Sequence, residues 1–209
     1  MITRATSSTD AVQVAQASWM PMVVIALAQI ILIFNVSTLQ VSVDGIASSF
    51  GAPATTVGTA IVTYALVVAG FIMLGGRIAE MFGARRVFRA TVLAFAAAMT
   101  LAALGPNETT MILAQIVAGA AAAALVPTLV VLVAQHYSGS QRERALGLLG
   151  GAFSLGIVLA FLIAGFLATA VHWRATFGLL VVLSAVTLRL SSRFVSIEGR
   201  PGVQVDRVG

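Results

Sequence analysis

Long apolar stretches alternate along this chain with short polar connections. Six such stretches are present, over residues 20–43, 56–75, 87–104, 110–135, 146–171 and 176–190. A helix that crosses the hydrocarbon core of a bilayer needs about 20 mostly apolar residues. The pattern therefore predicts an all-α, polytopic membrane protein with six transmembrane helices, of which the sixth is the shortest.

The connections between these stretches have the chemistry of turns. The segments Gly51-Ala52-Pro53, Gly105-Pro106-Asn107 and Ser138-Gly139-Ser140 each interrupt the apolar pattern. Gly, Pro and Asn are the residues that most favour turns. Because the connections are short, consecutive helices are expected to be antiparallel neighbours.

Composition agrees with a lipid environment. Of the 209 residues, 59% are hydrophobic and only 9% are charged, whereas about a quarter of the residues of a typical soluble domain are charged. The chain has no Cys, which excludes disulfides and thiolate ligands for metals.

The basic residues predict the orientation in the membrane. All twelve are Arg, and Arg174 alone falls on one side of the predicted membrane. The other eleven are Arg4, Arg77, Arg85, Arg86, Arg89, Arg142, Arg144, Arg189, Arg193, Arg200 and Arg207. Cytoplasmic flanks of membrane helices carry an excess of Arg and Lys, so we expect a multi-pass protein of the inner (plasma) membrane with both termini in the cytoplasm. The net charge of +5 is then a membrane feature, and no nucleic-acid partner is expected.

These boundaries divide the chain into three parts. We predict a cytoplasmic tail over residues 1–18, a transmembrane bundle over residues 19–190, and a cytoplasmic linker or tail over residues 191–209. The N-terminal tail is polar and lacks the apolar core of a cleaved signal peptide.

One connection carries an unusual concentration of charge. Between the second and third apolar stretches the chain reads Gly76-Arg77-Ile78-Ala79-Glu80-Met81-Phe82-Gly83-Ala84-Arg85-Arg86. We expect a charged turn here, with Gly83 permitting a tight bend, and with Glu80, Arg85 and Arg86 free to face helix termini of the matching sign. The simpler interpretation is an ordinary cytoplasmic turn that follows the positive-inside pattern.

The same segment resembles the signature of the major facilitator superfamily, roughly G-x-x-x-D-R-x-G-R-R, in the connection between that family's second and third helices. Gly76, Glu80, Gly83, Arg85 and Arg86 match it. Met81 stands where the family has its first Arg. The resemblance implies half of a major facilitator fold, the N-terminal six helices. It also implies that the five matching residues form a conformational latch against the other half.

Further segments resemble the fourteen-helix drug:proton antiporter branch of that family. They are Phe34 to Val41, Tyr64, Gln115 to Pro127, Arg142 to Gly147 and Trp173 to Phe177. Three departures affect the expected chemistry. Asn35 replaces the first-helix Asp of the branch, Gln115 stands where the fourth-helix Arg is expected, and the fifth-helix Pro is lost within Ala160 to Gly165. These changes put proton coupling in doubt.

Polar residues within the apolar stretches are the candidates for substrate binding, because polar groups in lipid tend to face a cavity or a partner helix. They are Gln29, Asn35, Gln40, Tyr64 and Gln115. Gln29 and Gln40 share a helix face, and Asn35 lies about 120° away from it. The alternative role for each residue is hydrogen bonding between helices.

The chain shows no candidates for catalysis. None of its seven acidic residues lies near a helix midpoint, and His136 and His172 stand at helix ends, so no proton relay is expected within the bilayer. No nucleophile with a paired base, phosphate loop or metal-ligand spacing is present. We expect no enzyme activity, no cofactor and no metal.

Small residues recur in the fourth and fifth apolar stretches. The run Gly119 to Ala124, and Gly147, Gly150, Gly151, Ser154 and Gly156, are of this kind. Small residues four apart allow membrane helices to approach closely. We expect them to mediate helix packing, the alternative being a sliding surface for conformational change.

Together these features predict membrane transport of a small organic compound, of the multidrug-efflux type, by a transporter half that works with a second six-helix unit, as a homodimer or with a separate chain. Two alternatives stay open at this stage. One is a truncated, inactive transporter. The other is a non-transporting membrane scaffold or regulator.

Overall fold

The computed structural model describes residues 17–194, and the part it describes is built from helices. These are α1 (Met20–Val41), α2 (Val43–Phe50), α3 (Ala54–Phe82), α4 (Ala84–Leu104), α5 (Glu108–His136), α6 (Gly139–Ala170) and α7 (Trp173–Phe194). Six of them, all except α2, are long and apolar enough to cross a membrane. The predicted all-α fold with six transmembrane helices is confirmed. The predicted tails over residues 1–16 and 195–209 lie outside the described residues.

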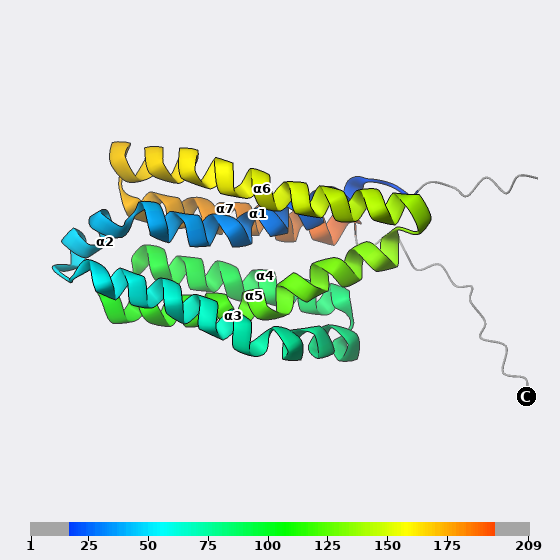
Figure 1. Cartoon of the computed structure of the whole chain (residues 1–209), viewed down its shortest axis with the longest axis horizontal. Helices are drawn as coiled ribbons and strands as arrows, with labels where there is room; N and C mark the ends of the chain where they lie inside the picture. Colours follow the sequence, from blue (N-terminus) through cyan, green and yellow to red (C-terminus); the bar gives the residue numbers. More distant parts are fainter. Residues whose placement is uncertain (1–16, 195–209) are drawn as a thin grey trace, which may run out of the picture.

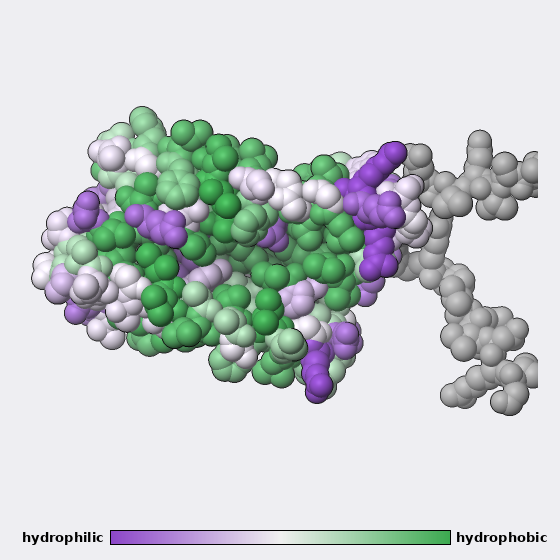
Figure 2. All heavy atoms as spheres, viewed as in Figure 1, coloured by the Kyte–Doolittle hydropathy of each residue, from purple (hydrophilic) through white to green (hydrophobic). Residues whose placement is uncertain are grey.

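The long helices run side by side along the longest axis of the molecule (Figure 1). Helix α6 packs mainly on α1, α3 packs mainly on α5, and α4 contacts both α5 and α7. Helix α1 begins and α7 ends at the same end of the bundle (Figure 1). Figure 2 shows a mostly apolar band between polar residues at the two ends of this face. That pattern fits a bundle whose middle lies in hydrocarbon.

Several helix boundaries differ from the predicted ones, among them the start of α6, which begins at Gly139 and not at residue 146. Helix α3 continues through the expected charged turn as far as Phe82, and the break is confined to Gly83, whose φ is 85°. The short helix α2 occupies part of the connection after α1, and α7 extends beyond the predicted stretch at both ends, from Trp173 to Phe194. Apolar stretches reveal the part of a helix within hydrocarbon, but a helix also continues through the polar interface.

The predicted turns coincide with the helix boundaries. Gly51 and Gly139 have φ values of 62° and 52°, a region that glycine enters without steric cost. Asn107 caps the start of α5, because its side-chain oxygen accepts hydrogen bonds from the backbone N–H of Thr110 at 2.9 Å and from its hydroxyl at 2.8 Å. Such a cap satisfies backbone donors that the helix leaves open.

Glycines allow two helices to approach closely at particular crossings of the bundle. A Cβ atom at Gly75 of α3 would collide with the carbonyl of Ala123 and approach the Cα of Ala124 to 2.6 Å. Gly119 of α5 lies similarly close to the backbone of Tyr64, and Gly156 of α6 close to Ile33. The packing role predicted for Gly119 and Gly156 is confirmed. Gly147, Gly150 and Gly151 are different, since a Cβ atom at each would meet nothing within 4 Å.

Contacts of Trp173 and Arg174 join several helices at the end of the bundle opposite the one where α1 begins and α7 ends. The indole N–H of Trp173 donates to the Ser49 hydroxyl at 2.8 Å, and Arg174 donates to the carbonyl oxygen of Ala103 at 2.7 Å. The Arg174 guanidinium lies 4.5 Å from the Trp173 ring centroid and 5.6 Å from that of Phe50. The one Arg predicted on this side therefore links α2, α4 and α7.

Candidate functional site

Two side-chain amides join α1 to α5 in the interior of the bundle. Asn35 Nδ2 donates to Gln115 Oε1 at 2.9 Å, and Gln115 Nε2 donates to Asn35 Oδ1 at 3.5 Å. Both residues have 0% of their surface exposed. An unpaired amide buried in an apolar environment costs about 1–3 kcal/mol. The reciprocal arrangement avoids this cost, because each amide donates to the other.

The amide pair is buried because α1 and α5 are the more buried helices of the bundle. In α1 and α5, 61% and 56% of the most apolar stretch is buried, against 17% in α3 and in α6. Asn35 and Gln115 lie on the buried faces of these two central helices. The structure therefore brings together two of the five predicted substrate-binding residues, and in the described conformation their hydrogen bonds are made between helices.

The other three candidates lie elsewhere. On α1, Gln29 is half-buried and Gln40 is exposed, in agreement with the helical geometry that separates them from Asn35. Tyr64 on α3 is 8% exposed. Its backbone lies against Gly119, which is one helical turn from Gln115 on α5. Tyr64 is thus near the amide pair along α5, whereas Gln40 faces away from it.

The residues expected to form a latch are distributed over the junction of α3 and α4. Glu80 and Arg86 are exposed, Gly76 and Arg85 are half-buried, and Gly83 forms the break between the helices. A Cβ atom at Gly76 would make only an ordinary contact with Pro127 at 3.8 Å. The crowded glycine is its neighbour Gly75, which the motif does not include.

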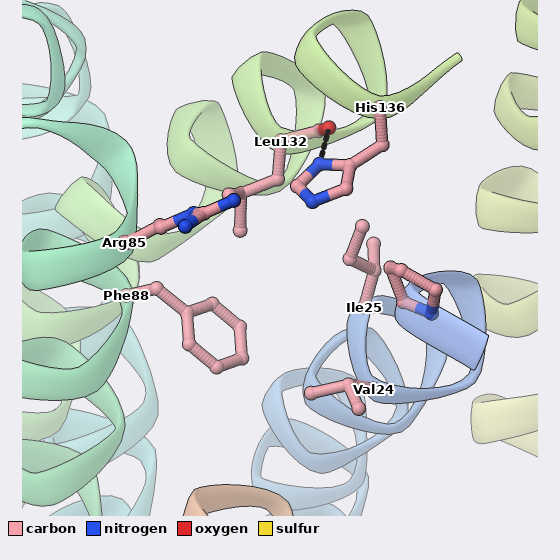
Figure 3. Close-up of a pocket in the computed structure, with 7 residues that line it drawn as sticks. Val24, Ile25, Arg85, Phe88, Leu132 and His136 are labelled. Carbon is pink, nitrogen blue, oxygen red and sulfur yellow. Dashed lines mark hydrogen bonds between the residues drawn. The ribbon is translucent and has the colours of Figure 1, made fainter. Parts of the chain in front are cut away.

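Arg85 points into a small recess between α1, α4 and α5, shown in Figure 3. Pro21, Val24, Ile25, Arg85, Phe88, Leu132 and His136 line it. His136 Nδ1 lies 2.8 Å from the carbonyl oxygen of Leu132, and since a carbonyl only accepts, the ring proton belongs on Nδ1. The recess has room for about one water molecule. It is therefore too small for an organic ligand.

A cluster that the sequence patterns did not indicate fixes the start of α1. The Tyr137 hydroxyl accepts from the backbone N–H of Met22 at 3.1 Å and donates to the carbonyl of Ser18 at 3.0 Å. The Tyr137 ring stacks on Trp19 with centroids 5.3 Å apart. The Gln141 side chain donates to the Ala17 carbonyl at 2.7 Å and accepts from its N–H at 3.2 Å.

Similarity to known proteins agrees with this architecture. A family model described as the Major Facilitator Superfamily matches residues 25–205. The puromycin resistance protein pur8 of Streptomyces alboniger is 30% identical over 75% of this chain and 31% of its own length. The lincomycin resistance protein of Streptomyces lincolnensis is 28% identical over 88% of this chain and 38% of its own length. The multidrug efflux pump LfrA of Mycolicibacterium smegmatis is 27% identical over 88% and 37%.

Solved structures share the fold. A crystal structure of the peptide transporter POT in complex with sulfate superposes with a TM-score of 0.75 at 17% sequence identity, covering 83% of this chain and 37% of that one. The chain spans 31% and 38% of the lengths of the puromycin and lincomycin resistance proteins. The family model covers most of the chain, and the six spans, the tight turn at Gly83 and the superposition agree with it. The chain belongs to the Major Facilitator Superfamily.

Proposed function

We propose that this chain is one six-helix half of a membrane transporter for a small organic compound, of the multidrug-efflux type, and that it works together with a second six-helix unit. Three relatives are named for resistance to puromycin, resistance to lincomycin and multidrug efflux. Their names supply the class of substrate proposed here.

One observation carries the need for a second unit. Only 17% of the most apolar stretch of α3, and likewise of α6, is buried within the chain. Two recesses at the ends of the described bundle, one bounded by Arg85 and His136 and the other by Phe50 and Glu108, are each too small for a drug-sized ligand. Secondary transporters place the substrate between two repeats at the bilayer midplane. A second unit against this chain would supply the missing wall.

The amide pair is the proposed polar centre of the substrate path. Asn35 and Gln115 are uncharged, so they offer hydrogen bonds without a titrating group. Gln29, Gln40 and Tyr64 are proposed to add polar contacts from α1 and α3. Gly76, Glu80, Gly83, Arg85 and Arg86 are proposed as the latch that holds one conformation. Proton coupling through residue 35 is not part of the proposal.

The protein is proposed to lie in the plasma (inner) membrane with both termini in the cytoplasm. The exposed Arg residues of the described part cluster at the end of the bundle where α1 begins, as the positive-inside rule requires. The absence of Cys permits a direct topology test. A Ser140→Cys variant should be protected from a membrane-impermeant maleimide in intact cells, whereas Thr55→Cys should be labelled. Labelling in the opposite sense contradicts the orientation.

Reconstitution in liposomes tests the function. Flux of radiolabelled puromycin and lincomycin would be measured with the purified chain, and an Asn35→Leu/Gln115→Met variant would be the matched control that keeps the bundle packed. Flux above that of empty liposomes, reduced in the control, supports the proposal. Absence of flux from the chain in every assembled form contradicts it and favours a non-transporting role.

A further inference from the structure

A short segment at the start of α1 is fastened to the junction of α5 and α6. Residues 17–22, which we call the strap, make hydrogen bonds to two side chains of that junction, Tyr137 and Gln141. Helix α1 begins at its N-cap Trp19 without a side-chain cap of its own. The Tyr137 hydroxyl accepts from the backbone N–H of Met22 in the first turn, so the cap of α1 is supplied by a distant part of the chain.

The strap contacts are of a kind that can be broken and made again. Ala17 is bound through its backbone to the Gln141 side chain, and Ser18 is bound through its carbonyl oxygen to the Tyr137 hydroxyl. Ser18 and Trp19 are exposed, so water replaces the protein partners when the strap leaves. A hydrogen bond that is exchanged for one to water contributes little net free energy. The strap is therefore suited to repeated release and closure.

The first part of α6 has few contacts that would hold it in place without the strap. Of residues 139–151, Ala145 alone is buried within the described chain. A Cβ atom at Gly147 or Gly151 would meet nothing within 4 Å, whereas one at Gly156 would collide with a side chain of α1. The close packing of α6 on α1 thus lies further along the helix, and the start of α6 depends on the strap for its position.

Helix α5 has a point of weakness on the other side of the junction. Pro127 lies inside the helix and has no N–H to donate to the carbonyl of Ala123. That carbonyl lies against Gly75 of α3 instead. The Thr128 hydroxyl donates to the carbonyl of Ala124 at 2.6 Å, a bond that often accompanies bending of a helix. Figure 1 shows α5 bending towards α6 over its last part. The last turns of α5 are therefore joined to the rest of the helix where bending is easiest.

The strap, the loosely held start of α6 and the proline of α5 together describe a movable element. We call residues 128–151 the hairpin tip. We propose that the strap is a releasable lock, which holds the hairpin tip on the start of α1 when closed and lets the tip swing away about Pro127 when released. Leu132 and His136 of the tip line the recess of Figure 3 together with Val24 of α1. Release of the strap therefore widens this recess.

Cysteine labelling measures the release, because the chain has no Cys of its own. Val24→Cys places a thiol in the recess at a position that is 4% exposed, and its reaction with a maleimide is timed in detergent micelles. Tyr137→Phe removes both hydrogen bonds of the hydroxyl and keeps the ring that stacks on Trp19. We expect this substitution to raise the labelling rate about tenfold. Gln141→Met alone should raise it several-fold, and it provides the test if the Phe variant does not fold.

Two controls separate release of the strap from general loosening of the bundle. Ala102→Cys is fully buried near the opposite end of α4 and should label slowly in every variant. Pro127→Ala restores the backbone donor of α5, so it should return the labelling of Val24→Cys in the Tyr137→Phe chain towards the unaltered rate. The proposal is overturned if loss of the strap bonds leaves the labelling of Val24→Cys unchanged, or raises it only together with that of Ala102→Cys. A rate that Pro127→Ala does not lower contradicts the pivot.

A crosslink connects the strap to transport, and the inference rests on the proposed function only for that connection. Ala17→Cys with Gln141→Cys, oxidised in liposomes, should keep the strap closed and lower the flux of the radiolabelled compounds about tenfold, and reduction should restore it. Oxidation that leaves the flux unchanged overturns the role of the strap in transport. Faster labelling of Val24→Cys in a chain without flux leaves the lock standing and removes the transport proposal. Flux in a chain whose labelling does not respond to the strap removes the lock and leaves transport standing.

Discussion

The side-chain amide of Asn35 on α1 hydrogen-bonds to that of Gln115 on α5, and both residues are fully buried. Where the drug:proton antiporters that this chain resembles have an Asp and an Arg, this structure places two amides in contact. The two substitutions are therefore one structural change. A single charge at either position would be buried without its partner, whereas two amides satisfy each other and need no ion.

The coupling between these amides can be measured with a double-mutant cycle. Asn35→Leu alone, or Gln115→Met alone, leaves one buried amide without its partner and should cost about 1–3 kcal/mol of unfolding free energy. The double variant replaces both polar groups and should cost less than the sum of the two. Gln40→Met, at an exposed position on α1, should have little effect. Unfolding in mixed detergent micelles gives the change in unfolding free energy for each of the four variants. Additive effects of the two single substitutions would mean that the two amides have no coupling energy.

The pair also predicts how a titratable group would behave at residue 35. Asn35→Asp introduces a carboxyl whose charged form is disfavoured by burial, so the variant should lose stability as the pH rises through the titration of that carboxyl. Gln115→Arg in the same chain supplies a counter-charge and should remove most of this pH dependence. Stability is measured between pH 4 and 8. If the single and double variants respond to pH alike, residues 35 and 115 are not electrostatically coupled.

The Asn35→Asp variant and the double variant Asn35→Asp with Gln115→Arg also test whether residue 35 is the site at which proton coupling was lost. If residue 35 is where coupling was lost, the double variant should show substrate flux that depends on an imposed pH gradient, and the unaltered chain should not. Asn35→Asp alone serves as the comparison, because it adds the carboxyl without the Arg. Equal dependence on the gradient in all three proteins would show that coupling does not involve this position.

The apolar pattern was sufficient to predict the fold, because six spans follow directly from the length of each stretch. It is less informative where a helix leaves the hydrocarbon: the pattern predicts that α3 ends before Gly76, whereas the helix continues to Phe82. The apolar pattern also does not predict contacts between segments that are distant in the sequence. Asn35 and Gln115 are each recognisable as polar residues in apolar stretches, but their hydrogen bond joins residues 80 positions apart and depends on how α1 and α5 pack.

The glycines show the same limit more sharply. The family motif begins at Gly76, whereas the close approach of α3 to α5 occurs at Gly75. The sequence places these residues next to each other, and only the helix phase determines which one faces the neighbouring backbone. In the fifth apolar stretch, Gly156 packs against α1 while Gly147 and Gly151 remain open.

Adjacent glycines of α3 therefore provide a matched pair of substitutions. Gly75→Ala forces a methyl group against the backbone of Ala123 and should destabilise the bundle by about 1–3 kcal/mol. Gly76→Ala meets only an ordinary contact with Pro127 and should be neutral, or stabilising by up to about 1 kcal/mol through helix propensity. Thermal unfolding of the purified variants provides the comparison. If Gly76→Ala destabilises the protein more than Gly75→Ala, the close contact between α3 and α5 does not occur at Gly75.

Arg174 is expected to act through its shape as well as its charge. Its guanidinium stacks on Trp173 and donates to the carbonyl of Ala103 at the end of α4. Lys keeps the positive charge but lacks the planar group that stacks on an aromatic ring, so Arg174→Lys should recover only part of the stability lost in Arg174→Gln. A loss of about 1–3 kcal/mol is expected for the Gln variant, from a charged hydrogen bond and a cation–π contact. Arg189→Gln, at an exposed position near the other end of α7, is the control for a general effect of lost charge. If Arg174→Lys is as stable as the unaltered chain, charge alone accounts for this residue and the stacking contributes nothing.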